Sequence, residues 1–141
     1  MTNPKLAGIR GALVKYGRSD TEWDELLDAA TDYLIEVAKS RSLTNYSDLS
    51  AELVNRTGYA RFDYNLDRDQ AAVGALLGEV TDGTLDDSAT MLSALVVQKT
   101  TGDPGEGFYR FARKLGLLRP GVEKLEFFQA QVARVHEKYK G

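Results

Sequence analysis

The chain has 141 residues, a net charge of −3, 43% hydrophobic residues, no cysteine and one histidine. A chain of this size and apolar content forms one domain with a compact core. The lack of cysteine excludes disulfides, thiolate nucleophiles and cysteine-ligated metal sites, and the single His136 leaves no histidine-pair metal motif. No apolar run approaches the roughly 18 residues that span a bilayer, and no signal-peptide pattern is present, so we expect a cytoplasmic protein without a membrane partner.

Two helices are expected in the first 58 residues. A short helix or ordered arm over residues 5–16 precedes them. Residues 20–39 form the clearest helix, because apolar side chains recur at helical spacing and Ser19 with Glu22 has capping-box spacing. A second helix should begin near Tyr46, where Asn45 is a suitable N-cap, and end at Gly58.

A third helix should begin at Asp67, with Gln70 at the reciprocal capping position and Gly83 as its terminating residue. Residues 91–98 are almost continuously apolar, which predicts a strand buried on both faces. Turn residues follow over 101–107.

Two more helices are expected near the C-terminus. The first is short, carries Phe108 and ends at Gly116. The second carries an apolar stripe of Val122, Leu125, Phe128, Val132, Val135 and Tyr139. The predicted fold class is therefore mainly α with a small β element.

The sequence offers no convincing catalytic constellation. Ser93 lies between apolar residues rather than on a strained turn, and the only histidine is some forty residues away. The glycines of residues 102–107 match no phosphate-binding fingerprint. The carboxylates near Asp82 match no calcium loop. We therefore expect a protein that is not an enzyme and that uses no cofactor or metal.

Four short segments occur in an informative order: Asn45-Tyr46-Ser47-Asp48-Leu49-Ser50, Ala71-Ala72-Val73-Gly74-Ala75-Leu76, Leu92-Ser93-Ala94-Leu95-Val96-Val97 and Glu106-Gly107-Phe108. In this order they resemble the winged-helix domain of DNA alkyltransferases and alkyltransferase-like proteins. The resemblance implies one domain over residues 1–141, with a winged-helix-like core at about 44–116 and helical extensions at 1–43 and 117–141.

The chain departs from that family where its chemistry resides. Ser93 stands at the position of the reactive cysteine, Ala94 at that of the following histidine, and Ala71 or Ala72 at that of the base-flipping arginine. Alkyl transfer needs a thiolate, so that activity is not expected.

Aromatic side chains alternate with cations in this region, which suits stacking and phosphate contacts; the alternative is that the aromatics pack in the core. Our prediction is a non-catalytic, winged-helix-like nucleic-acid-binding protein in regulation or genome defence, with DNA lying against the helix at 67–82. The predicted contact residues are Tyr46, Arg56, Arg61, Arg68, Lys99 and Arg110. The acidic total charge favours an alternative, a protein-interaction module that binds no DNA.

Overall fold

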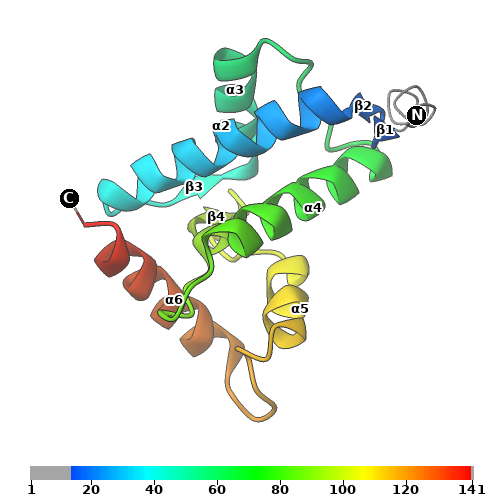
Figure 1. Cartoon of the computed structure of the whole chain (residues 1–141). Helices are drawn as coiled ribbons and strands as arrows, with labels where there is room; N and C mark the ends of the chain where they lie inside the picture. The colour runs from blue at the N-terminus through cyan, green and yellow to red at the C-terminus, as the bar shows by residue number, and fades with distance from the viewer. Residues whose placement is uncertain (1–13, 141) are drawn as a thin grey trace, which may run out of the picture.

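The computed structural model describes residues 14–140, and Figure 1 shows their arrangement. Within these residues the chain is mainly helical with small β elements, as predicted. The helices are α2 (Asp20–Lys39), α3 (Tyr46–Thr57), α4 (Asp67–Thr84), α5 (Glu106–Lys114) and α6 (Lys124–Lys138). The 3-10 turn η1 spans Leu92–Leu95, and the strands are β1 (Val14–Lys15), β2 (Arg18–Ser19), β3 (Thr44–Asn45) and β4 (Val96–Val97). None of the helices in this part of the chain is long and apolar enough to cross a membrane.

Helices α2 and α3 begin at the side-chain caps that the sequence predicted. The hydroxyl of Ser19 accepts the amide of Glu22 at 3.1 Å, and the side chain of Asn45 accepts the amide of Asp48 at 2.9 Å. Helix α3 ends at Gly58, whose φ of 77° is accessible to glycine at no steric cost. Local sequence therefore sets the ends of these elements.

The predicted N-terminal element over residues 5–16 lies mostly outside the described residues. Its last part is not helical, because Val14–Lys15 pairs with Arg18–Ser19 in an antiparallel hairpin. The two turn residues, Tyr16 and Gly17, both have positive φ, the conformation that matches the twist of a two-residue hairpin. The ring of Tyr16 then packs 5.6 Å from that of Trp23 in α2.

The buried segment at 91–98 is the main correction to the predicted secondary structure. Its first part is the turn η1, in which the amide of Ala94 donates a hydrogen bond to the carbonyl of Met91. Only Val96–Val97 is a strand. Strand β4 pairs in parallel with β3, with Thr44 opposite Val96. The segment is buried on both sides as expected, but helices rather than neighbouring strands cover it, so a long ladder does not form.

The segment divides its apolar side chains between two hydrophobic clusters. The larger cluster joins α2, α3 and α4 and receives Leu92, Leu95 and Val96. The smaller cluster receives Met91, Ala94 and Val97 and is completed by Phe108, Tyr109, Ala112, Leu118 and Phe128. In Figure 1 the segment accordingly lies at the centre of the molecule, with α2 and α4 on one side and α5 and α6 on the other.

Three further details of the sequence prediction are wrong. Helix α4 continues through Gly83 to Thr84, whose hydroxyl bonds back to the carbonyl of Val80 at 2.8 Å. The side chain of Gln70 does not cap the helix but donates to the carbonyl of Tyr64 at 2.6 Å. Val122 lies before α6, which begins at Lys124 after the cap Glu123, and neither Val122 nor Leu125 joins the buried stripe, since they are 47% and 48% exposed.

Candidate functional site

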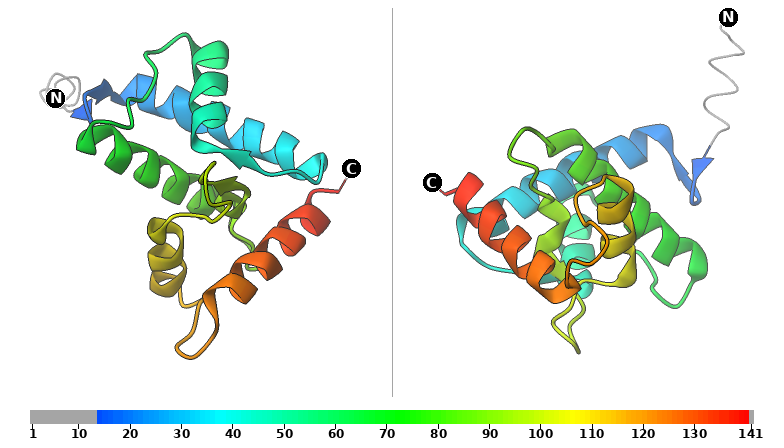
Figure 2. Two further views of the ribbon diagram at one scale, coloured as in Figure 1. Left: turned by 180° about the vertical axis from the view of Figure 1, so that it is seen from behind. Right: turned by 90° about the horizontal axis from the view of Figure 1, so that it is seen from below.

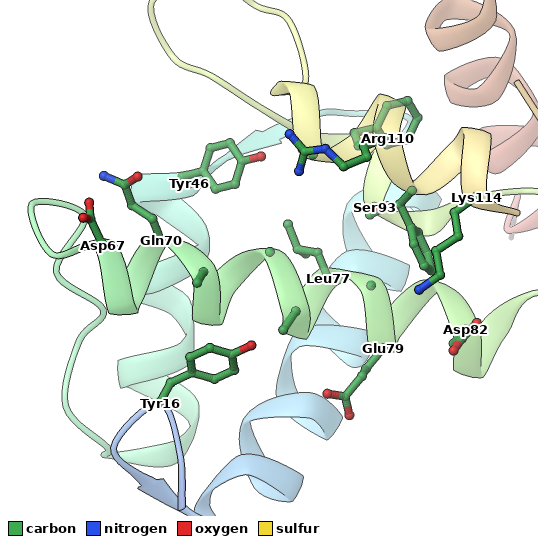
Figure 3. Close-up of a pocket in the computed structure, with 17 residues that line it drawn as sticks. Tyr16, Tyr46, Asp67, Gln70, Leu77, Glu79, Asp82, Ser93, Arg110 and Lys114 are labelled. Atoms are coloured by element: carbon green, nitrogen blue, oxygen red, sulfur yellow. The ribbon is translucent and has the colours of Figure 1, made fainter.

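The described residues form an open groove of about 910 Å³ along helix α4. Helix α5 supplies the opposite wall, and Figure 3 shows the labelled side chains that line it. The volume lies within the range of pockets that hold small-molecule ligands. The groove is therefore the natural candidate for a binding site.

Four small residues line the α4 wall of the groove. Ala71, Gly74, Ala75 and Gly78 recur at helical spacing and all line the groove. A Cβ added at Gly74 would meet no atom within 4 Å, and one at Gly78 would meet only the ring of Phe111, at 3.9 Å. The backbone of α4 is thus open to close approach by a flat ligand. Leu77 is the one large aliphatic side chain on this wall.

The α5 wall is aromatic and cationic. Phe108 and Phe111 line the groove beside Arg110 and Lys114, which are one helical turn apart and both exposed. Neither cation has a hydrogen-bond or ion-pair partner within the described part of the chain. Arg113, by contrast, is paired with Glu106 at 3.1 Å. The guanidinium of Arg113 holds the pKa of Glu106 below its usual range, with help from Lys124.

Tyr46 closes one end of the groove. Its hydroxyl and the guanidinium of Arg110 point toward each other above α4 in Figure 3. The ring of Tyr46 is held edge-on by Tyr64, with 5.9 Å between centroids, and its carbonyl accepts the Tyr64 hydroxyl at 2.9 Å. Burial raises the pKa of Tyr46, so its hydroxyl stays neutral and can donate a hydrogen bond at ordinary pH.

Ser93 contributes the polar part of the groove where η1 meets α4. It is only 7% exposed, and its hydroxyl accepts the hydroxyl of Thr81 at 2.9 Å. The one histidine is engaged elsewhere, because the Nε2 of His136 lies 2.9 Å from the carbonyl oxygen of Ser42. Ser93 therefore has a structural partner and no imidazole partner among the described residues.

The structure brings two of the six predicted contact residues, Tyr46 and Arg110, to the groove. Arg56 instead joins α3 to α2, because its guanidinium binds both carboxylate oxygens of Glu36, at 2.8 and 2.9 Å, and Glu52 at 2.9 Å. These carboxylates raise the pKa of Arg56. Three of its five N–H donors are thus engaged and two carboxylates balance its charge, so a phosphate would have to compete with them.

The other three predicted cations are not among the residues that line the groove. Arg61 donates to the carbonyl of Ser47 at 3.3 Å. Arg68 lies beside Asp69, with 3.4 Å between the two side chains, and faces Gly17. Lys99 is exposed on the loop after β4, which projects from the molecule in the right view of Figure 2.

Sequence reasoning missed Lys114 and Phe111 as groove residues. Their signal was present, because residues 107, 110, 111 and 114 recur at helical spacing and must share one face of a short helix. What the sequence could not supply was the partner of that face, since α4 is more than twenty residues away along the chain.

In the described residues, no group of three or more histidine, aspartate or glutamate side chains is placed to hold a metal ion. Comparisons of the chain with protein-family models, with curated proteins and with solved structures found no significant match. The function has to be argued from the groove itself.

Proposed function

We propose that the chain is a non-catalytic nucleic-acid-binding protein with a winged-helix-like core, and that the groove between α4 and α5 is its binding surface. One observation carries the proposal. All four segments that resemble the alkyltransferase family contribute residues to this single groove: the start of α3, the middle of α4, the turn η1 and the start of α5. Four independent stretches of sequence converge on one surface, which is what a shared binding role would require.

The order of elements also supports a winged-helix-like core. Strand β3 leads into α3, α4 follows, and η1 leads into β4, which pairs back onto β3. Two hydrogen bonds hold the loop after β4. The amide of Gln98 donates to the carbonyl of Asp103 at 2.9 Å, and the hydroxyl of Tyr109 donates to the Asp103 carboxylate at 3.0 Å. This anchored, projecting loop occupies the place of a wing and carries Lys99.

The proposed contacts are those that the groove makes available. Arg110 and Lys114 contact phosphates, Lys99 contacts a phosphate from the loop, and Tyr46 and Phe111 offer aromatic surface to bases. Arg56 is not part of this set, because Glu36 and Glu52 engage three of its five donors and balance its positive charge.

The same geometry supports a role without covalent chemistry. Ser93 is hydrogen-bonded to Thr81, and no base lies beside it within the described residues. Nucleophilic catalysis by serine needs an adjacent base to remove the hydroxyl proton. A serine-directed fluorophosphonate should therefore leave the protein unmodified, and stoichiometric labelling at Ser93 would contradict this part of the proposal.

The test is oligonucleotide binding followed by fluorescence anisotropy, beginning at about 20 mM salt, where the screening length is about 20 Å. Labelled oligonucleotides should bind, and log affinity should fall linearly with log salt. Replacing Gly74 by glutamine fills the groove and should abolish binding. Gly83→Gln is the matched control, because Gly83 is also an open glycine of α4 but does not line the groove.

Both glycine variants should remain folded, since a Cβ at either position would meet no atom within 4 Å and glycine is the poorer helix former by about 1 kcal/mol. Equal binding by the two variants would place the contact elsewhere. Absence of binding to every oligonucleotide at low salt would remove the proposal.

One observation favours the alternative, a protein-interaction module. Asp67, Glu79 and Asp82 also line the groove, and carboxylates repel phosphates. A basic protein segment would find these groups attractive. If no oligonucleotide binds at low salt, this alternative becomes the better interpretation of the groove.

A further inference from the structure

We infer that Tyr109 and Asp103 are positioning residues for the phosphate contact of Lys99, because the hydrogen bond between them fixes the loop after β4 relative to α5. This inference rests on the proposed function and deepens it, since it concerns how the loop and the groove wall present their cations to one nucleic acid. Three features carry it: the closure of the loop, its bond to α5, and an exposed cation on each of the two parts.

The loop at residues 98–103 is closed by hydrogen bonds of its own. The amide of Gln98 donates to the carbonyl of Asp103 at 2.9 Å, and the amide of Gly102 donates to the carbonyl of Gln98 at 2.8 Å. The hydroxyl of Thr101 donates to the side-chain oxygen of Gln98 and accepts the amide of Asp103, both at 3.2 Å. Gly102 has a φ of 71°, which glycine adopts without strain. The loop therefore sets its own shape, and what remains to be set is its direction.

A hydrogen bond from α5 sets that direction. The hydroxyl of Tyr109 donates to the Asp103 carboxylate at 3.0 Å. Tyr109 is 2% exposed, and its ring packs edge-on against Phe108 with 5.4 Å between centroids, so the donor is held in place by the smaller hydrophobic cluster. Burial and the neighbouring Asp103 raise the pKa of Tyr109, so the hydroxyl keeps its proton at ordinary pH. The buried Pro104 also restricts the backbone of Asp103 to extended conformations.

Each of the two joined parts carries an exposed cation. Lys99 lies on the loop, which projects from the molecule in Figure 2, and Arg110 follows Tyr109 on α5 and lines the groove. A loop without the bond to α5 would lose conformational entropy whenever Lys99 contacts a phosphate, whereas a fixed loop has lost it on folding. Removal of the bond should therefore weaken the contact of Lys99 and leave that of Arg110 unchanged.

The test is the salt dependence of oligonucleotide binding, followed by fluorescence anisotropy. Lys99→Ala should reduce the slope of log affinity against log salt by about 0.7 to 0.9, the value for one phosphate contact. Tyr109→Phe keeps the ring and removes the hydroxyl; it should reduce the slope by part of that amount and weaken binding about threefold. Tyr59→Phe is the matched control, because the Tyr59 hydroxyl also donates to a carboxylate at 3.0 Å, that of Glu25, and neither residue lines the groove.

Double variants separate positioning from a general loss of structure. In a Lys99→Ala background, Tyr109→Phe should have no further effect on affinity, whereas in an Arg110→Ala background its effect should be undiminished. A merely structural role would weaken binding in both backgrounds. Asp103→Asn should retain the affinity, because the amide oxygen still accepts the Tyr109 hydroxyl. Asp103→Ala should behave like Tyr109→Phe, and it gives the same test from the half-buried loop side if Tyr109→Phe does not fold.

The outcomes distinguish this inference from the proposed function. If the wild type binds but Tyr109→Phe and Tyr59→Phe have equal slopes, the bond does not position Lys99 and the inference fails alone. It also fails alone if Lys99→Ala leaves the slope unchanged, because the loop then makes no phosphate contact. Absence of all binding by the wild type at low salt would overturn both.

Discussion

The two hydrophobic clusters of this protein are built in different ways. The larger one is formed by long amphipathic helices, and most of its members are aliphatic side chains on α2, α3 and α4. The smaller one is assembled from a turn, the short helix α5, a loop and α6. It also depends on hydrogen bonds from one buried side chain to the backbone. The side chain of Gln131 accepts a hydrogen bond from the amide of Met91 at 2.7 Å and donates one to the carbonyl of Ala89 at 3.0 Å.

The groove lies where these two regions meet. Helix α4 belongs to the larger cluster and α5 to the smaller one, so the shape of the groove depends on how the two clusters are joined at residues 91–97. One wall of the groove therefore belongs to a cluster formed by long helices, and the other to a cluster that combines apolar packing with hydrogen bonds from Gln131 to the backbone. The following experiments test this division, from the largest expected effect to the smallest.

Val96→Asp should unfold the protein. Val96 is 1% exposed and joins β4 to the larger cluster, so the change buries an unpaired charge. The cost should be about 5 kcal/mol or more, comparable with the whole stability of a domain. Circular dichroism melting measures it, with Val122→Asp as the control because Val122 is 47% exposed. A wild-type melting curve for Val96→Asp would contradict the assigned core.

Truncating a leucine to alanine should cost more stability in the larger cluster than in the smaller one. Leu76→Ala, at a fully buried position among three helices, should cost about 4 kcal/mol, since rigid surroundings leave a cavity. Leu118→Ala, in the smaller cluster, should cost about 2 kcal/mol, because loops relax into the space. Urea denaturation gives both values. A greater loss for Leu118→Ala would reverse the proposed ranking of the clusters.

Removing the hydrogen bonds of Gln131 should destabilise the smaller cluster and leave the larger cluster unchanged. Gln131→Leu leaves the buried amide of Met91 without an acceptor, which should cost about 1–3 kcal/mol. Hydrogen exchange should then accelerate at Met91 and not in α2. Gln129→Leu is the control, because Gln129 is exposed on the same helix. Uniformly accelerated exchange would indicate a single cooperative unit.

The smallest expected effect on stability is the loss of the interactions of Asp86 at acidic pH. Hydrogen bonds from the side chain and backbone of Ser88, with help from Lys138, lower the pKa of Asp86 to about 2. Because the folded pKa is lower than the unfolded one, this stabilisation is present above about pH 4 and is lost as the pH falls toward 2. Melting temperatures of Asp86→Asn and wild type should converge over that window. A constant difference from pH 6 to pH 2 would show that Asp86 contributes no pH-dependent term.

Much of the helical framework could be predicted from local sequence. Ser19 and Asn45 mark the starts of α2 and α3 because a cap needs only a side-chain oxygen two or three residues from a free amide. The apolar spacing of residues 20–39 likewise indicates which side of α2 is buried. These features depend on interactions within a few residues, so the sequence by itself determines them.

The tertiary structure decided the rest. A run of apolar residues at 91–98 indicates burial but not conformation, because helices on both sides satisfy it as well as strands do. The sequence also did not determine which cations are paired with carboxylates and which line the groove. Arg56 and Arg110 look alike in the sequence, yet Arg56 is bound by carboxylates from α2 and α3, whereas Arg110 reaches the groove. Which arginine is paired with carboxylates depends on contacts between residues far apart in the chain, and only the packing of the helices brings those residues together.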